Sequence, residues 1–213
     1  PYDQFNLALH VGDDPQLVLD NRHLLSEVTG IGRIQWLEQV HGNAVLKAEG
    51  ATPSSVPMAD ASWTDNRGLG LAILTADCLP VVLAAADGSA VGVAHAGWRG
   101  LLSGVLEQLL VTMPGPASEY AAWIGPAISQ SAYEVGEEVA AQVRQRSRGS
   151  ILIPGRKAGK YQLDLPGLAS AMMKDLGVSE ISSCGVCAAG DVRTYSYRRD
   201  GVTGRMATVA WLR

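Results

Sequence analysis

Residues 71–100, LAILTADCLPVVLAAADGSAVGVAHAGWRG, decide the fold of this chain. They hold two runs rich in Val, Ile, Leu and Ala, separated by the turn signal Asp87-Gly88-Ser89. Two apolar runs joined by a tight turn predict a buried β-hairpin. Each run also carries residues that an apolar strand does not need: Cys78 in the first run, and His95 and Arg99 at the end of the second. A hairpin that presents a thiol, an imidazole and a guanidinium is a candidate functional site.

The composition is typical of a globular protein, with 47% hydrophobic and 18% charged residues. The chain has 213 residues, enough for one substantial core, so we expect a single domain over residues 1–213. The net charge of -4 does not indicate binding to nucleic acid or to acidic lipids. No apolar run reaches the about 18 residues that a membrane span needs. We therefore expect no nucleic-acid or membrane partner. We also expect a small-molecule substrate and a monomer.

Three cysteines are present, Cys78, Cys184 and Cys187. An odd count without a signal peptide favours reduced thiols in the cytoplasm over a disulfide framework. Cys184 and Cys187 form a CxxC motif, which can be half of a zinc site or a redox dithiol. Because no second CxxC accompanies it, we interpret this pair as packing residues. The chain begins at Pro1 without a methionine, so we expect a short natural N-terminal segment before it.

Helices and strands are predicted along the rest of the chain without a strict alternation. The first helix has Asp14 as its N-cap and Pro15 at the first helical position. The mixture predicts one α/β (α+β) domain with mixed β-sheets packed against helices. Helices are expected over residues 15–28, 101–113, 134–146 and 165–176, strands over 6–11, 34–40, 44–47, 120–124, 178–186, 194–197 and 207–212, and a loop over 50–59.

The chain has four histidines, and two of them occupy similar positions. His41 and His95 each lie where an apolar strand gives way to a glycine-containing turn. Loops at strand ends are where a rigid scaffold presents functional groups. His23 lies inside the first predicted helix and is interpreted as a surface residue, whereas His10 lies in a polar turn region.

His41, Cys78 and His95 together form a three-ligand set that suits zinc and leaves a fourth position for water or substrate. A metal-free alternative uses Cys78 as a nucleophile and His95 as its base, and does not need His41. A non-catalytic binding protein is a third class. Copper is the less favoured metal, although a His2Cys set resembles a blue-copper site. Four histidines are too few for a mononuclear copper together with a trinuclear cluster.

Two charged residues complete the candidate site. Asp77 lies within an apolar run, where a charge is costly unless it is paired, and it can orient a metal ligand. Arg99 can hold a phosphate, a carboxylate or an oxyanion through two hydrogen bonds. Glu38 and Asp77 are the nearest acids for general acid catalysis. The aromatic and basic run over residues 195–205 can hold a base or a sugar phosphate, or form a solvated hairpin.

Several motifs together resemble one known family, the YfiH family. It is also called the laccase-domain or polyphenol oxidase family and the peptidoglycan editing factor family, PgeF. The resemblance covers the chain from Asn6 to Leu212 and rests on motifs that occur in order. They are Gln39-Val40-His41-Gly42, Thr75-Ala76-Asp77-Cys78-Leu79-Pro80, His95-Ala96-Gly97-Trp98-Arg99-Gly100, Trp123-Ile124-Gly125-Pro126-Ala127-Ile128, Tyr133-Glu134-Val135-Gly136 and Ser196-Tyr197-Arg198-Arg199.

The resemblance implies a zinc-dependent purine nucleoside enzyme that phosphorolyses adenosine, inosine and methylthioadenosine and deaminates adenosine. It places the metal ligands at His41, Cys78 and His95, the trio chosen above. It also implies a fold shared distantly with cysteine hydrolases that use a Cys–His pair. An alternative activity of the family is hydrolysis of wrongly built UDP-muramoyl-amino acid precursors of peptidoglycan. One departure from the family pattern, Ser129-Gln130-Ser131-Ala132, leaves the proposed ligands untouched.

Overall fold

The predicted hairpin forms the centre of a six-stranded sheet. In the computed structural model, which describes residues 1–2, 5–50, 55–147 and 151–213, β5 (Leu79–Ala85) pairs antiparallel with β6 (Val91–Ala96). The register places Leu79 opposite Ala96 and Pro80 opposite His95. The sheet has the order β11-β7-β5-β6-β3-β2. Its other strands are β2 (Val45–Lys47), β3 (Ala61–Thr64), β7 (Tyr120–Ile124) and β11 (Glu180–Ser183).

The first apolar run does not form one strand. It contains β4 (Leu69–Thr75), which ends before Asp77 and belongs to a different sheet from β5. β4 lies between β1 (Arg33–Gln35) and β12 (Met206–Ala210) in a three-stranded sheet. Asp77 has a φ of 90°, and this left-handed residue turns the chain from one sheet to the other. The prediction of two strands in the quoted stretch is therefore corrected to three.

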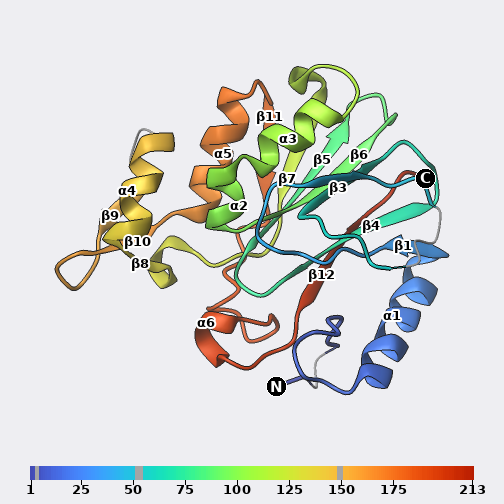
Figure 1. The fold of residues 1–213 in the computed structure, drawn as a ribbon, viewed down its shortest axis with the longest axis horizontal. Coiled ribbons are helices and arrows are strands. Elements are labelled where there is room, and N and C mark those ends of the chain that lie inside the picture. Colours follow the sequence, from blue (N-terminus) through green and yellow to red (C-terminus); the bar gives the residue numbers. More distant parts are fainter. Residues whose placement is uncertain (3–4, 51–54, 148–150) are drawn as a thin grey trace.

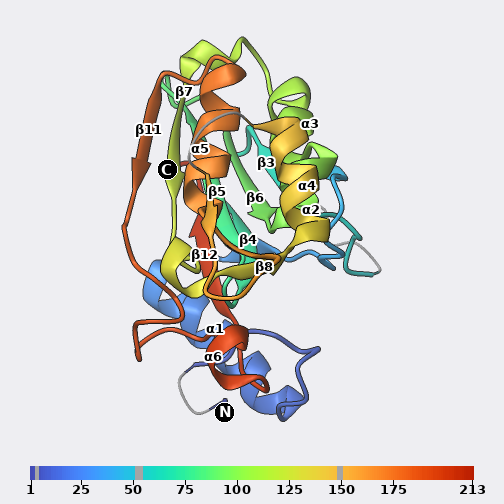
Figure 2. The same ribbon diagram turned by 90° about the vertical axis from the view of Figure 1, so that its left-hand side faces the viewer.

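The two sheets stack face to face. Leu71 and Ile73 of β4 pack against Val91 and Val93 of β6, and this buried cluster joins the layers. α1 (Pro15–Thr29) lies beyond the smaller sheet, where Leu25 packs near Leu74 of β4. Figures 1 and 2 show the helices α2, α3 and α5 on the opposite side of the larger sheet. Strands buried on both faces explain why β4, β5 and β6 read as continuous apolar runs.

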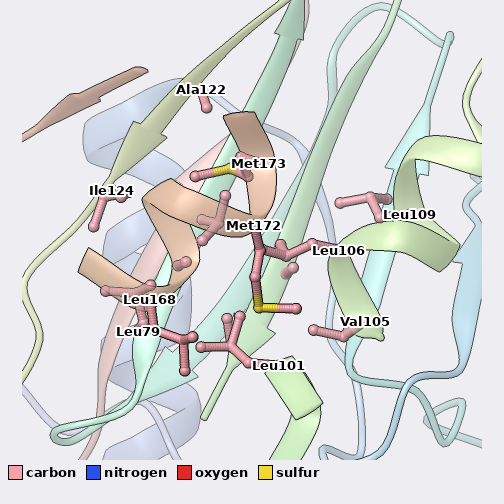
Figure 3. Close-up of a cluster of buried hydrophobic side chains, with 14 of the residues drawn as sticks. Leu79, Leu101, Val105, Leu106, Leu109, Ala122, Ile124, Leu168, Met172 and Met173 are labelled. Carbon is pink, nitrogen blue, oxygen red and sulfur yellow. The ribbon is translucent and has the colours of Figure 1, made fainter. Parts of the chain in front are cut away.

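The largest core lies between the six-stranded sheet and these helices. α2 (Trp98–Ser103), α3 (Val105–Thr112) and α5 (Leu165–Asp175) contribute Leu101, Leu106 and Met172 to it, against Leu79 of β5 (Figure 3). The expected helix over residues 101–113 is two helices, because Gly104 adopts a φ of 87° and ends α2. The expected helix over 165–176 is confirmed as α5.

A small outlying sheet and helix complete the fold. β8 (Glu134–Gly136), β10 (Lys160–Leu163) and β9 (Leu152–Pro154) pair in the order β8-β10-β9. The helix expected over 134–146 starts later, as α4 (Glu137–Arg146), because its first residues belong to β8. Two short 3-10 helices, η1 (Ala117–Glu119) and η2 (Gln130–Ala132), lie between elements.

The first helix is confirmed, with its cap. The Asp14 side chain accepts a hydrogen bond from the Gln16 amide, and Gly30 ends the helix with a φ of 72°. The expected strand over 34–40 shortens to β1, with Glu38 in an isolated bridge to Met58. The strands expected over 44–47, 178–186 and 207–212 appear as β2, β11 and β12. The loop expected over 50–59 lies partly outside the described residues.

Two predicted strands are wrong, both for the same physical reason. Residues 6–11 form no strand, because the side-chain oxygen of Asn6 accepts hydrogen bonds from the Ala8 and Arg205 amides. Residues 194–197 also form no strand; the Ser196 hydroxyl accepts from the Arg199 amide and caps α6 (Tyr197–Asp200). In both places a short polar side chain replaces a strand partner.

Both views place α6 and the N-terminal residues together at one end of the molecule, below the sheets (Figures 1 and 2). The layers form one mixed α/β domain, as expected. No helix within the described ranges is long and apolar enough to cross a membrane.

Candidate metal centre

His95 is the most buried of the three candidate ligands. It lies within β6, opposite Pro80 of β5, and only 3% of its surface is exposed. Its Nδ1–H donates to Oδ1 of Asp60 at 2.8 Å, and the Asp60 side chain is fully buried. This bond fixes the imidazole tautomer and leaves Nε2 as the nitrogen free to bind a ligand.

His41 reaches the site from an exposed turn between β1 and β2. Its φ of 61° is unusual for a residue other than glycine. The same Asp60 carboxylate holds this turn: Oδ1 accepts from the His41 amide at 2.8 Å, and Oδ2 accepts from the Val40 and Gly42 amides at 3.1 and 2.8 Å. One buried carboxylate therefore positions both histidines.

Cys78 completes the cluster where the chain passes from β4 to β5. Its Sγ lies 3.9 Å from Nε2 of His41, and the His41 and His95 rings meet edge to face with centroids 4.7 Å apart. The glycine of the His95-Ala96-Gly97 motif makes room for this arrangement. A Cβ on Gly97 would lie 2.9 Å from the Cys78 sulfur and 3.4 Å from the His41 ring.

Cys78 and His95 stabilise each other's charged forms, and Asp60 stabilises charge on His95. Burial disfavours the Cys78 thiolate, but hydrogen bonds from His41 and His95 outweigh it and lower the Cys78 pKa to about 6. Burial likewise disfavours charge on His95, yet hydrogen bonds to Asp60 and Cys78 raise its pKa to about 9. For Asp60, burial is outweighed by the His95 and backbone hydrogen bonds, and its pKa is lowered.

The donor set fits a metal ion. The ligand atoms of His41, Cys78 and His95 all lie within 4.8 Å of one another. Tetrahedral zinc, with bonds of about 2.0 Å to nitrogen and about 2.3 Å to sulfur, places these ligand atoms about 3.3–3.5 Å apart. Small side-chain rotations close that difference. A thiolate, two imidazoles and a carboxylate behind one of them are the groups that zinc sites use.

The cluster lies in the wall of a cavity of about 360 Å³. The cavity extends from the cluster toward α6 and the N-terminal segment. Two tyrosines, two arginines and a third histidine contribute to its lining. The lining residues are His10, Gln39, His41, Leu74, Thr75, Ala76, Asp77, Cys78, His95, Ile128, Tyr133, Tyr197, Arg198 and Arg205.

Asp77 lines this cavity, but it does not orient a metal ligand as the sequence analysis expected. Its Oδ1 accepts from the Ser196 hydroxyl and its Oδ2 from the Arg198 amide, each at 2.6 Å. It thus ties the C-terminal segment to the crossing between sheets, and the carboxylate that orients a histidine is Asp60. Asp60 was missed because the buried strand that follows it, Ala61–Thr64, contains Ser62 and Thr64 and is not an apolar run in the sequence.

Arg99 lies outside the cavity. Its guanidinium is exposed and rests over the Trp98 ring, 4.5 Å from the centroid. With Lys160 and Arg198 it lines a separate hollow of about 420 Å³ beside Tyr133. Glu38 is exposed and does not line the cavity with the cluster.

The remaining candidates stay apart from the cluster. Cys184 and Cys187 are free thiols, and the Cys187 sulfur accepts a hydrogen bond from the Ser129 amide at 3.4 Å. His23 is exposed on α1 and pairs with Glu27. Among the described residues, His41, Cys78 and His95 are the one group of three or more His, Cys, Asp or Glu side chains placed to hold a metal.

Comparison with known proteins places the chain in a family. A family model described as multi-copper polyphenol oxidoreductase laccase matches residues 1–213. The chain belongs to this family. The laccase/YfiH family includes a purine nucleoside phosphorylase of Pseudomonas aeruginosa, 42% identical over 218 residues, with 100% of this chain and 87% of the relative aligned. It also includes the purine nucleoside phosphorylase YfiH of Escherichia coli, 40% identical over 214 residues, with 100% and 88% aligned.

Solved structures of laccase/YfiH proteins share the fold. YlmD from Geobacillus stearothermophilus superposes with a TM-score of 0.92 at 31% identity, covering 100% of this chain and 86% of that one. A Neisseria meningitidis protein gives a TM-score of 0.91 at 38% identity, with 99% and 87% covered. These likenesses confirm the fold and the family resemblance predicted from the motifs.

Proposed function

We propose that this laccase/YfiH chain is a zinc-dependent purine nucleoside enzyme, which phosphorolyses adenosine, inosine and methylthioadenosine and deaminates adenosine. The observation that carries the proposal is the cluster of His41, Cys78 and His95 in the wall of a cavity of about 360 Å³. That volume lies in the range of small-molecule sites. The relatives named purine nucleoside phosphorylase support the substrate class.

The roles of the chain's own residues follow from their contacts. His41, Cys78 and His95 would hold the ion, and Asp60 keeps His95 in the tautomer that presents Nε2. A zinc ion bound there would polarise a substrate group and acidify a water molecule. Tyr133 and Tyr197 line the cavity and offer aromatic faces to a purine.

Asp77 and Arg99, the two predicted catalytic residues, take different places in this proposal. Asp77 is a positioning residue, because its oxygens hold Ser196 and Arg198 at the cavity edge. Arg99 can contact only a substrate that extends past Tyr133 into the neighbouring hollow.

A second candidate function rests on the hydrogen bond between His95 and Asp60 and on the Cys78 sulfur, which lies within 4.8 Å of the His95 ligand nitrogen. An acid, an imidazole and a thiol in this order suit a metal-free cysteine hydrolase. Its substrate class would be the UDP-muramoyl-amino acid precursors named above. His41 is dispensable in this reaction, because the base is His95.

Phenol oxidation by several copper ions is disfavoured. That chemistry needs a mononuclear copper and a trinuclear cluster, and the described residues offer one cluster of three ligands. Three free cysteines fit a reducing compartment, and we propose that the enzyme works in the cytoplasm as a monomer.

The test combines metal analysis with assays of adenosine in the presence and absence of phosphate. We expect about one zinc per chain, phosphate-dependent release of adenine, and loss of both in His41→Ala. Copper at one or more ions per chain together with phenol oxidation would overturn the proposal. Activity that survives His41→Ala without metal would favour the cysteine hydrolase instead.

A further inference from the structure

Arg205 lines the same cavity as the cluster of His41, Cys78 and His95, and part of its guanidinium is free to donate hydrogen bonds. Its Nη1 donates to the carbonyl oxygens of Thr203 and Gly204 at 2.8 and 2.9 Å. Within the described ranges, neither Nε nor Nη2 has a hydrogen-bond partner, and Arg205 makes no ion pair. By contrast, Arg144, Arg146, Arg193 and Arg199 each pair with a carboxylate.

The backbone around Arg205 is fixed from two sides. Its amide donates to Oδ1 of Asn6 at 2.9 Å, and its carbonyl oxygen accepts from the Leu7 amide at 3.3 Å. The same Asn6 side chain bonds both the amide and the carbonyl of Ala8. These contacts bring the segment that carries His10 against Arg205, and both side chains line the cavity.

The charges in this part of the cavity favour an anion. Arg205 is partly buried, and burial lowers its pKa, outweighing the opposite influence of Cys78 and Asp77. Burial and the charges of Arg205 and Arg22 lower the pKa of His10. Asp77, the one acidic residue among the described lining residues, accepts from the Ser196 hydroxyl and the Arg198 amide. A planar guanidinium with two free donor nitrogens, Nε and Nη2, matches the oxygens of a phosphate group.

We propose that Arg205, assisted by His10, forms an oxyanion subsite for a phosphate group at the end of the cavity formed by the N-terminal segment and residues 203–205. Its use as the site of the phosphate co-substrate rests on the proposed function. The subsite takes the anion-binding role that the sequence analysis gave to Arg99, which lies outside this cavity.

The test is a calorimetric titration of inorganic phosphate, and separately of AMP, into the full metal-loaded chain. Arg205→Gln should weaken binding about tenfold or more, since a charge-assisted hydrogen bond is lost. Arg205→Lys keeps the charge without the fork and should recover part of the loss. Arg67→Gln, an exposed arginine of the β3–β4 turn, is the matched control and should bind like the wild type. Metal content and the thermal unfolding midpoint of each variant separate misfolding from lost binding.

Phosphate binding by Arg205→Gln within about twofold of wild type would overturn the subsite. The subsite would also be overturned if Arg99→Gln lost phosphate binding while Arg205→Gln kept it. The same holds if the wild type bound neither probe saturably. Binding of AMP but not inorganic phosphate, lost in Arg205→Gln, supports the subsite and assigns it to a nucleotide phosphate. Adenosine phosphorolysis is assayed in parallel. If phosphate binding depends on Arg205 but adenosine is not turned over, the subsite stands and the proposed function is refuted. If adenosine is turned over and Arg205→Gln leaves the phosphate KM unchanged, the proposed function stands and the subsite is refuted.

Discussion

The two histidines of the cluster are held in opposite ways. His95 lies near the end of the regular strand β6, is 3% exposed, and has its side chain bonded to Asp60. His41 lies in an exposed turn with a φ of 61°, and only its backbone is bonded to Asp60. The difference teaches that the fold supplies one rigid ligand, and that a single buried carboxylate positions the turn that carries the other.

Replacing either histidine by alanine, in separate variants, should have the largest effects. Both variants should lose stoichiometric metal, because two protein ligands do not make a zinc site. Their stabilities should differ when the metal-free proteins are compared in denaturant. His95→Ala should lower the free energy of unfolding by about 3 kcal/mol, since it leaves the buried Asp60 carboxylate without its partner. His41→Ala should cost less than about 1 kcal/mol, because the side chain is exposed. Equal losses would contradict the distinction.

Asp60→Asn tests the carboxylate that both histidines share. The amide has one oxygen in place of two, so it cannot accept all four of the hydrogen bonds made by Asp60. We expect metal affinity to fall about 10–100-fold, as for other residues that orient a metal ligand. Competition with a chromophoric chelator measures it. Asp65→Asn, which removes an exposed partner of Lys47, is the matched control and should leave affinity unchanged.

Gly97→Ala narrows the space between the ligands. The added methyl group would lie 2.9 Å from the Cys78 sulfur, so the thiol or the β6–α2 turn must shift. Metal affinity should fall about tenfold, a change that corresponds to 1.4 kcal/mol. Gly32→Ala is the control, since a Cβ there meets no atom within 4 Å. An effect of the same size in both variants would show that the loss is general and unrelated to the site.

The last prediction concerns the pH dependence of metal binding by the unchanged chain. The His95 pKa is raised to about 9, so below that pH the metal must displace one proton from the imidazole. Apparent affinity should therefore rise about tenfold per pH unit between about pH 6.5 and 8.5. Below about pH 6 the Cys78 thiolate also gains a proton, and the dependence should steepen. A flat profile in metal-buffered titrations would refute this account of the coupled pair.

The sequence predicted the parts of the molecule that periodicity controls. The hairpin of β5 and β6, the capped helix α1, and the trio His41, Cys78 and His95 all followed from residue type and spacing. The division of the first apolar run between two sheets did not, because both strands are buried on two faces and their apolar patterns merge. Only the left-handed turn at Asp77 separates them.

Long-range polar contacts were equally invisible in the pattern. Asp60 lies 35 residues before His95, and its role depends on a register that only the folded sheet sets. The side-chain bonds of Asn6 to the Arg205 amide and of Asp77 to the Ser196 hydroxyl join distant segments and replace two expected strands by loops and a short helix. Arg99 looked suited to the site from its neighbours in sequence, but its side chain lies on Trp98, outside the cavity.

X-ray absorption at the zinc edge of the purified, zinc-supplemented protein tests the central claim most directly. The account predicts about one zinc per chain with one sulfur neighbour at about 2.3 Å and two imidazole nitrogens at about 2.0 Å. The sulfur signal should disappear in Cys78→Ser, whereas Cys184→Ser should retain it. A protein without bound zinc, or a zinc whose sulfur neighbour survives Cys78→Ser, would contradict the metal centre described above.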